Sequence, residues 1–176
     1  MAGLDIALVA PDCRPVAIVL DLLRHGQALP AGPEGDRQRM LSPAGVRRLT
    51  SLAARLAREG WRPDRVFSSP YARALDSARI VLRASAPAVA VEPLRALESE
   101  QEPSEVIEAL VQRGVAAGHV LVVGHQPLLG RLVGYLTGVE QGLSPGMLVR
   151  VHCPQGMDQG SGRITLTQAP EDLELA

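Results

Sequence analysis

The stretch A-I-V-L-D-L-L at residues 17–23 runs directly into R-H-G at residues 24–26. A nearly continuous apolar run of this length is typical of a strand that is covered on both faces. The stretch H-V-L-V-V at residues 119–123 has the same character and runs into G-H-Q-P at residues 124–127. Both stretches therefore predict buried strands with a histidine just beyond the carboxyl end.

Helical patterns fill the chain around these strands. Ser42 and Pro43 have the order of an N-cap followed by proline at the first helical position, and the apolar spacing that follows ends at Gly60. Further helices are expected over residues 71–82, from residue 103, and from residue 127 to a stop at Gly138. Residues 65–68 and 88–91 are expected to be short strands, and residues 147–152 and 163–168 alternate like antiparallel strands. This order predicts an α/β sandwich with a largely parallel sheet, closed by antiparallel strands.

Length and composition indicate one ordinary domain. The chain has 176 residues, of which 46% are hydrophobic, and we expect the domain to cover residues 17–170, with an N-terminal extension at 1–16 and a tail at 171–176. The net charge is −1 and no basic tract is present, so we expect neither nucleic acid nor an anionic membrane as a partner. We find no signal peptide and no membrane span, and expect a cytoplasmic protein. Cys13 and Cys153 are interpreted as two lone thiols.

Chemically active side chains follow three of the expected strands. Arg24 and His25 end the first strand, Arg73 begins the helix after residues 65–68, and His125 follows the strand at residues 119–123. In open α/β sheets the active site lies at the carboxyl ends of the strands. We therefore expect these four side chains to form one cationic pocket.

Such a pocket suits phosphoryl transfer, because a phosphate monoester is a dianion whose transition state spreads charge over the equatorial oxygens. Arg24 and Arg73 each present paired donors for those oxygens. Neutral His25 is the candidate nucleophile, kept neutral by the two guanidinium groups. His125 is a candidate hydrogen-bond donor to an equatorial oxygen, and Gly26 allows the backbone to approach the phosphate closely.

Four ordered blocks resemble the histidine phosphatase superfamily, which includes the phosphoglycerate mutases. They are L-L-R-H-G-Q-A at 22–28, L-S-P-A-G at 41–45, S-P-Y-A-R-A-L-D-S-A at 69–78 and V-V-G-H-Q-P at 122–127. The resemblance implies a phosphoglycerate mutase-like fold, a three-layer α/β/α sandwich. It implies that His25 is phosphorylated and that Arg24, Arg73 and His125 bind the phosphoryl group. It also implies catalysis without a metal, and we expect no cofactor.

The short chain looks most like the small bacterial branch that removes phosphate from phosphohistidine in proteins. D-R-Q-R-M-L-S at 36–42 resembles a block of that branch and places Arg39 at the mouth of the pocket, as a candidate substrate-binding residue. Larger members carry insertions that cover the site. The chain lacks such insertions, so the resemblance implies an open site that admits a phosphoprotein.

The general acid departs from the family pattern. Many members have L-x-E at this point, whereas residues 97–100 read L-E-S-E, so Glu98 and Glu100 both miss the spacing and are only possible acids. A phosphatase of small phosphate esters is the alternative, favoured if Glu98 or Glu100 is poised in the pocket, and a catalytically idle phosphate-binding domain is a third. A metal site shared by His119 and His125 is excluded, because six residues of strand span roughly 20 Å.

Overall fold

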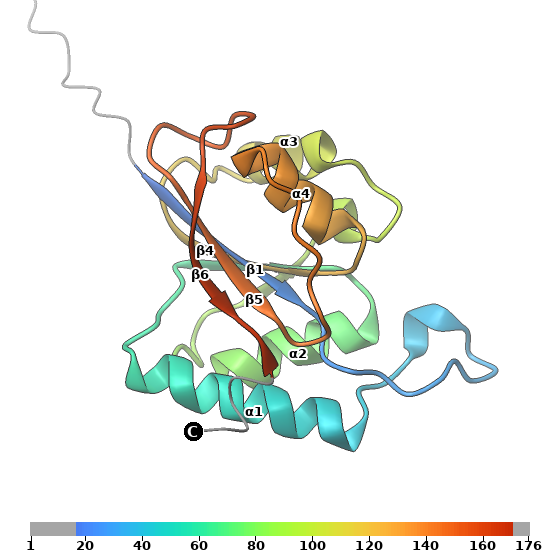
Figure 1. Ribbon diagram of the computed structural model, residues 1–176. Helices are drawn as coiled ribbons and strands as arrows, with labels where there is room; N and C mark the ends of the chain where they lie inside the picture. Colours follow the sequence, from blue (N-terminus) through green and yellow to red (C-terminus); the bar gives the residue numbers. More distant parts are fainter. Residues whose placement is uncertain (1–16, 171–176) are drawn as a thin grey trace, which may run out of the picture.

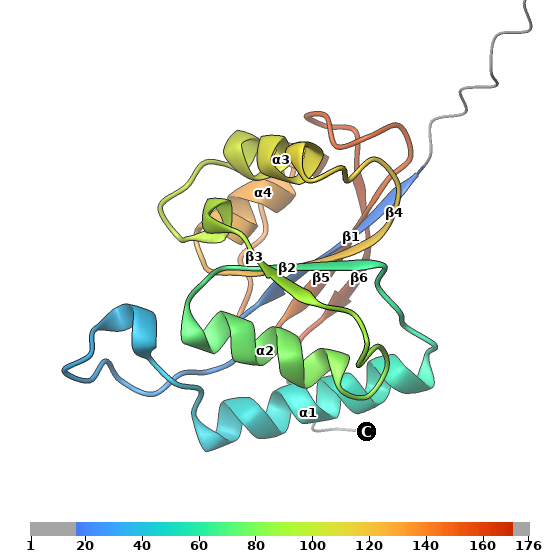
Figure 2. The same cartoon turned by 180° about the vertical axis from the view of Figure 1, so that it is seen from behind.

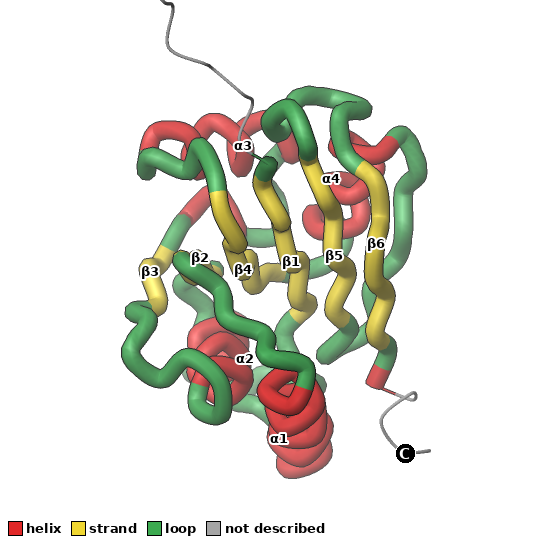
Figure 3. The backbone as a smooth tube through the Cα atoms, turned by 90° about the vertical axis from the view of Figure 1, so that its left-hand side faces the viewer, coloured by secondary structure: helices red, strands yellow, loops and turns green. Residues whose placement is uncertain are grey.

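One mixed sheet of six strands forms the centre of the molecule, in the order β3-β2-β4-β1-β5-β6 (Figure 3). The computed structural model describes residues 17–170, so the expected extension with Cys13 and the expected tail at 171–176 lie outside the described residues. The strands are β1 Ile18–Arg24, β2 Arg65–Ser68, β3 Val91–Pro93, β4 Gly118–Gly124, β5 Leu148–Cys153 and β6 Arg163–Gln168.

The first four strands are parallel and the last two close the sheet in the antiparallel sense. The long ladder between β1 and β4 runs from Ile18 opposite Gly118 to Arg24 opposite Gly124. On its other edge β1 pairs with β5, which in turn pairs with β6. The expected mostly parallel sheet with antiparallel closing strands is confirmed. The central pair also aligns the carboxyl ends of β1 and β4, which places the residues after them side by side.

Helices cover both faces of the sheet and make three layers (Figures 1 and 2). On one face lie α1 Pro43–Arg58 and α2 Ala72–Leu82, and on the other α3 Pro103–Gln112 and α4 Leu128–Thr137. Each layer buries its own apolar cluster, with Leu49, Leu52 and Leu56 under α1 and Leu129, Leu132 and Leu136 under α4. Ser42 caps α1 as expected, since its Oγ accepts the backbone N–H of Gly45 at 3.0 Å.

Two segments differ from the expectations. The strand expected at residues 88–91 instead covers Val91–Pro93. The neighbouring strand β2 has only four residues, and its last three, Val66 to Ser68, pair with Val91 to Pro93. The residues before it turn instead, with the N–H of Val89 bonded to the carbonyl of Ala86. The loop expected at residues 29–40 contains a short 3-10 helix, Asp36–Gln38, and projects from the body beside α2 (Figure 1).

One buried carboxylate lies inside the α1–α2 layer. Asp21 of β1 has no exposed surface, and its oxygens accept hydrogen bonds from Trp61 Nε1 at 2.6 Å, His119 Nε2 at 2.7 Å and Arg150 Nε at 2.7 Å. Burial raises the pKa of Asp21, but hydrogen bonds from His119 and Arg150 outweigh it and hold the pKa below its ordinary value. His119 thus has a structural role.

Cys153, in β5, is a free and buried thiol.

None of the helices found between residues 17 and 170 has both the length and the apolar character that crossing a membrane requires.

Candidate active site

The carboxyl ends of β1, β2 and β4 meet at one edge of the sheet. The N–H of His25 bonds to the carbonyl of Gly124 at 3.1 Å, and that of Ser69 bonds to the carbonyl of Val123 at 2.8 Å, so the backbone ladder continues one step beyond the strands. The rings of His25 and His125 lie 4.9 Å apart, centroid to centroid. Arg24 and Arg73 join both histidines in the wall of one cleft of about 380 Å³.

His25 is held in the tautomer that a nucleophile needs. Its Nδ1 lies 2.8 Å from the carbonyl oxygen of Gly26, and because a carbonyl only accepts, Nδ1 carries the proton. Its Nε2 therefore keeps a lone pair, which accepts a hydrogen bond from Arg73 Nε at 3.2 Å. Burial, with the charges of Arg73 and Arg24, lowers the pKa of His25 to about 4 against the opposing bond to Gly26. The imidazole is neutral at physiological pH.

Arg73 lies at the start of α2 and is 5% exposed. Its Nε faces His25 and its Nη2 faces His125 Nδ1 at 3.4 Å. Its outer atoms contact Asp36 of the projecting loop, with Nη1 at 2.6 Å from the Asp36 carbonyl oxygen and Nη2 at 2.9 Å from Oδ2. The guanidinium group therefore lies between the two histidines and the loop.

Arg24 carries an unused donor. Its Nη1 donates to the carbonyl of Leu143 at 2.7 Å, which fixes the guanidinium group. Its Nε is buried and has no hydrogen-bond partner within the part of the chain that the structure describes. A buried donor without a partner costs about 1–3 kcal/mol, more when it is charged. Because Arg24 lines the cleft, its guanidinium group is a candidate to bind an anion there.

His125 is anchored by the loop after β2. Its Nε2 lies 2.8 Å from Ser69 Oγ, and the Tyr71 ring packs against it with centroids 4.8 Å apart. A hydroxyl both donates and accepts, so Ser69 satisfies either tautomer. Nδ1 faces Arg73 Nη2 at 3.4 Å and accepts in that contact, and the other tautomer, which Ser69 also satisfies, would let Nδ1 donate to a bound anion. Burial, the neighbouring His25 and the charge of Arg73 lower the pKa of His125 to about 3. This ring is also neutral at physiological pH.

Gly26 has a packing role in addition to the one expected from the sequence. A Cβ atom on Gly26 would lie 2.7 Å from Leu49 Cδ1, so a larger residue at the end of β1 would force the buried Leu49 side chain of α1 to move. The N–H of Gly26 donates to Ser77 Oγ at 3.0 Å, and Ser77 Oγ donates to the carbonyl of Arg73 at 2.6 Å. Ser77 thereby ties the loop that carries His25 to α2, and a direct contact of Gly26 with substrate stays a prediction.

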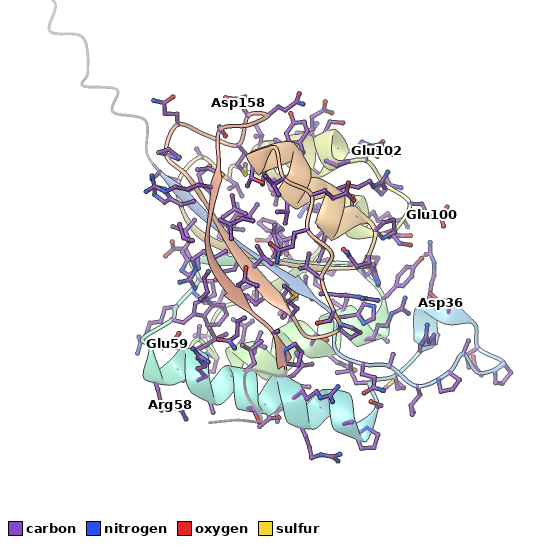
Figure 4. The ribbon with its side chains drawn as sticks, in the orientation of Figure 1. Asp36, Arg58, Glu59, Glu100, Glu102 and Asp158 are labelled. Atoms are coloured by element: carbon purple, nitrogen blue, oxygen red, sulfur yellow. The ribbon has the colours of Figure 1, made fainter. Side chains whose placement is uncertain are left out.

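The other candidates lie at the rim. Arg39 lines the cleft, while its Nε donates to the Leu29 carbonyl and its Nη1 contacts Asp36 Oδ1 at 3.1 Å, and its binding of substrate stays a prediction. Glu98 forms an ion pair with Arg37 at 2.8 Å. Glu100 is exposed and points outward from the loop before α3 (Figure 4), whereas Ser99, between these two acids, lines the cleft.

Sequence reasoning missed Ser69, Ser77 and Asp36. All three stand inside blocks quoted for the resemblance, which was the only signal available, because their roles depend on contacts between distant segments.

Between residues 17 and 170 no three His, Cys, Asp or Glu side chains are arranged to hold a metal ion.

Comparisons with known proteins agree with this geometry. The family model of the histidine phosphatase superfamily, branch 1, matches residues 20–101. The chain is similar to the solved structure of the protein histidine phosphatase SixA complexed with tungstate, with 26% identity, a TM-score of 0.76, and coverage of 88% of this chain and 99% of that one. No curated protein matches the chain in sequence.

Two further solved structures share the fold. The putative phosphohistidine phosphatase SixA from Agrobacterium tumefaciens is 22% identical, with a TM-score of 0.71 and coverage of 89% of this chain and 99% of that one. Phosphoglycerate mutase from Bacillus anthracis str. Sterne is 16% identical, with a TM-score of 0.69 and coverage of 92% and 97%. The family model, the solved structures and the cleft thus agree, and the chain is similar to members of the histidine phosphatase superfamily.

Proposed function

We propose that the protein is a phosphatase that removes phosphate from phosphohistidine in a protein substrate, through a phosphoryl group carried on His25. The observation that carries the proposal is the Nε2 lone pair of His25, buried in a cleft beside the guanidinium group of Arg73. The similarity to a protein histidine phosphatase at 26% identity supports this substrate class.

The reaction has two displacements. Nε2 of His25 attacks phosphorus, the P–N bond of the substrate breaks, and the leaving imidazole takes its proton from water. A water molecule then attacks the phosphoryl group on His25, the new P–N bond breaks, and inorganic phosphate leaves. The proton that the attacking water loses neutralises the hydroxide left by the first step. In both steps Arg24 and Arg73 bind the equatorial oxygens, and His125 donates to one of them.

An open rim supports a macromolecular substrate. Ala28 and Arg39 line the cleft, and the next residues outward, Leu29 and Met40, are exposed by 44% and 55%. The N–H of Leu29 bonds to the carbonyl of Met40, so the two lie on neighbouring stretches of one loop. A protein surface around a phosphohistidine would cover these apolar side chains. We also expect a cytoplasmic location and no nucleic-acid partner.

The alternative is a phosphatase of small phosphate esters, which needs a general acid near the leaving oxygen. Glu98 and Glu100 remain the possible acids, although Glu98 is bound to Arg37 and Ser99 holds the place on the cleft wall between them. Parallel assays of a phosphohistidine protein and a panel of alkyl phosphates distinguish the two functions. Faster turnover of the phosphohistidine protein supports our proposal, faster turnover of an ester supports the alternative, and turnover of neither indicates an idle phosphate-binding domain.

A further inference from the structure

The guanidinium group of Arg73 uses two different edges. The side-on edge, formed by Nε and Nη2, faces the histidines, at 3.2 Å from His25 Nε2 and 3.4 Å from His125 Nδ1. The end-on edge, formed by Nη1 and Nη2, faces Asp36, whose carbonyl oxygen and Oδ2 accept from it at 2.6 and 2.9 Å. Only the side-on edge is directed toward the nucleophile.

Asp36 is itself anchored to the loop that carries it. Its Oδ1 contacts Arg39 Nη1 at 3.1 Å, and Arg39 Nε donates to the Leu29 carbonyl at 2.8 Å. A chain of hydrogen bonds therefore runs from the backbone at Leu29 through Arg39 and Asp36 to Arg73. A long arginine side chain loses rotamer entropy when it is fixed, so a partner that fixes the group before an anion arrives lowers the cost of binding.

We propose that Asp36 is a positioning residue that holds Arg73 by its end-on edge, so that the side-on edge receives two oxygens of the phosphoryl group between His25 and His125. This role rests on the proposed function for its biological meaning, but anion binding tests it without turnover. It also assigns Arg39 to the support of Asp36, in addition to its place in the cleft wall.

A proton-donating role for Asp36 is disfavoured by its surroundings. Its carboxylate accepts from two guanidinium groups, and a group in that position is stabilised in its ionised form. Burial raises the pKa of Asp36, but hydrogen bonds from Arg39 and Arg73 outweigh it and hold the pKa below its ordinary value.

The test measures tungstate binding by calorimetry in the full chain. We expect Asp36→Ala to weaken tungstate binding by about tenfold, within the range of one lost charge-assisted hydrogen bond, and Asp36→Asn to weaken it less because an amide oxygen still accepts. Glu34→Ala is the matched control, since Glu34 is an exposed acid on the same loop and its removal changes the net charge equally. Its tungstate affinity should stay within about twofold of the parent.

A double-mutant cycle separates positioning from a general effect on the loop. If Asp36 acts through Arg73, then Asp36→Ala should cost little tungstate affinity in an Arg73→Lys background, because lysine has no second edge to orient. Equal losses in both backgrounds, or parent-like binding by Asp36→Ala, would overturn the proposal. A pH profile of kcat that loses its alkaline limb in Asp36→Asn would also overturn it, in favour of an acid. Parent protein that binds tungstate without hydrolysing phosphohistidine would instead count against the proposed function alone.

Discussion

Replacing Arg24 with lysine isolates the buried donor of the site. Lysine keeps the positive charge but removes Nε, the donor that is buried without a partner among the described residues. Lysine also lacks the planar guanidinium group, whose orientation in the parent is fixed by the hydrogen bond from Nη1 to the Leu143 carbonyl. One charge-assisted hydrogen bond contributes about 1.5–3 kcal/mol, and each 1.4 kcal/mol is a factor of ten. Arg24→Lys should therefore weaken tungstate binding by roughly tenfold to a hundredfold.

Calorimetry with tungstate and competition kinetics with inorganic phosphate measure this loss independently. Arg113→Lys is the control, because Arg113 is a surface arginine that contacts Glu92 at 3.3 Å with nearly half of its side chain exposed. It should leave both affinities within about twofold of the parent. Parent-like tungstate affinity in Arg24→Lys would mean that Nε faces no anion, and the assignment of Arg24 to the phosphoryl group would be wrong.

Three further predictions concern the nucleophile, the acids and the core. His25→Ala should abolish both turnover and the acid-labile, base-stable label left by a phosphodonor, and full activity in this variant would refute the mechanism. Glu98→Gln and Glu100→Gln should each keep phosphohistidine turnover within about tenfold of the parent, below the usual general-acid effect; a variant that abolishes hydrolysis of a good alkyl phosphate would identify the acid and favour the ester phosphatase. Asp21→Asn should lower the free energy of unfolding by up to about 3–5 kcal/mol at pH 7. Since the folded pKa of Asp21 is depressed, its contribution is present above the unfolded value of about 3.9 and is lost as pH falls through the folded pKa, so denaturant titrations should show the variant's deficit shrinking in acid.

The sequence predicted best what depends on local pattern. Continuous apolar runs gave β1 and β4, and the proline and serine at the start of α1 gave its N-terminus. The convergence of Arg24, His25 and His125 also followed from pattern, because strand ends in a parallel sheet share an edge.

The remaining features depend on contacts between distant segments. The position of β3 is set by its pairing with the short strand β2. The local sequence at residues 88–91 contains no information about the length of β2, so it could not predict where β3 begins. The contact of Asp36 with Arg73 joins a loop to a helix 37 positions away, and nothing in the local sequence of either predicts it. Asp21 looks like an interruption in an apolar strand until Arg150 is brought beside it by β5.

The central place of β1 has a consequence for how the protein is made. Synthesis delivers β1, with Arg24 and His25, before either of its neighbours, since β4 begins at Gly118 and β5 at Leu148. Until then the strand has two unpaired edges and apolar side chains that attract other extended chains. His25 is thus translated early, and the cleft around it is assembled late: a nascent chain that ends before β4 has this histidine but lacks His125 and the wall that faces it.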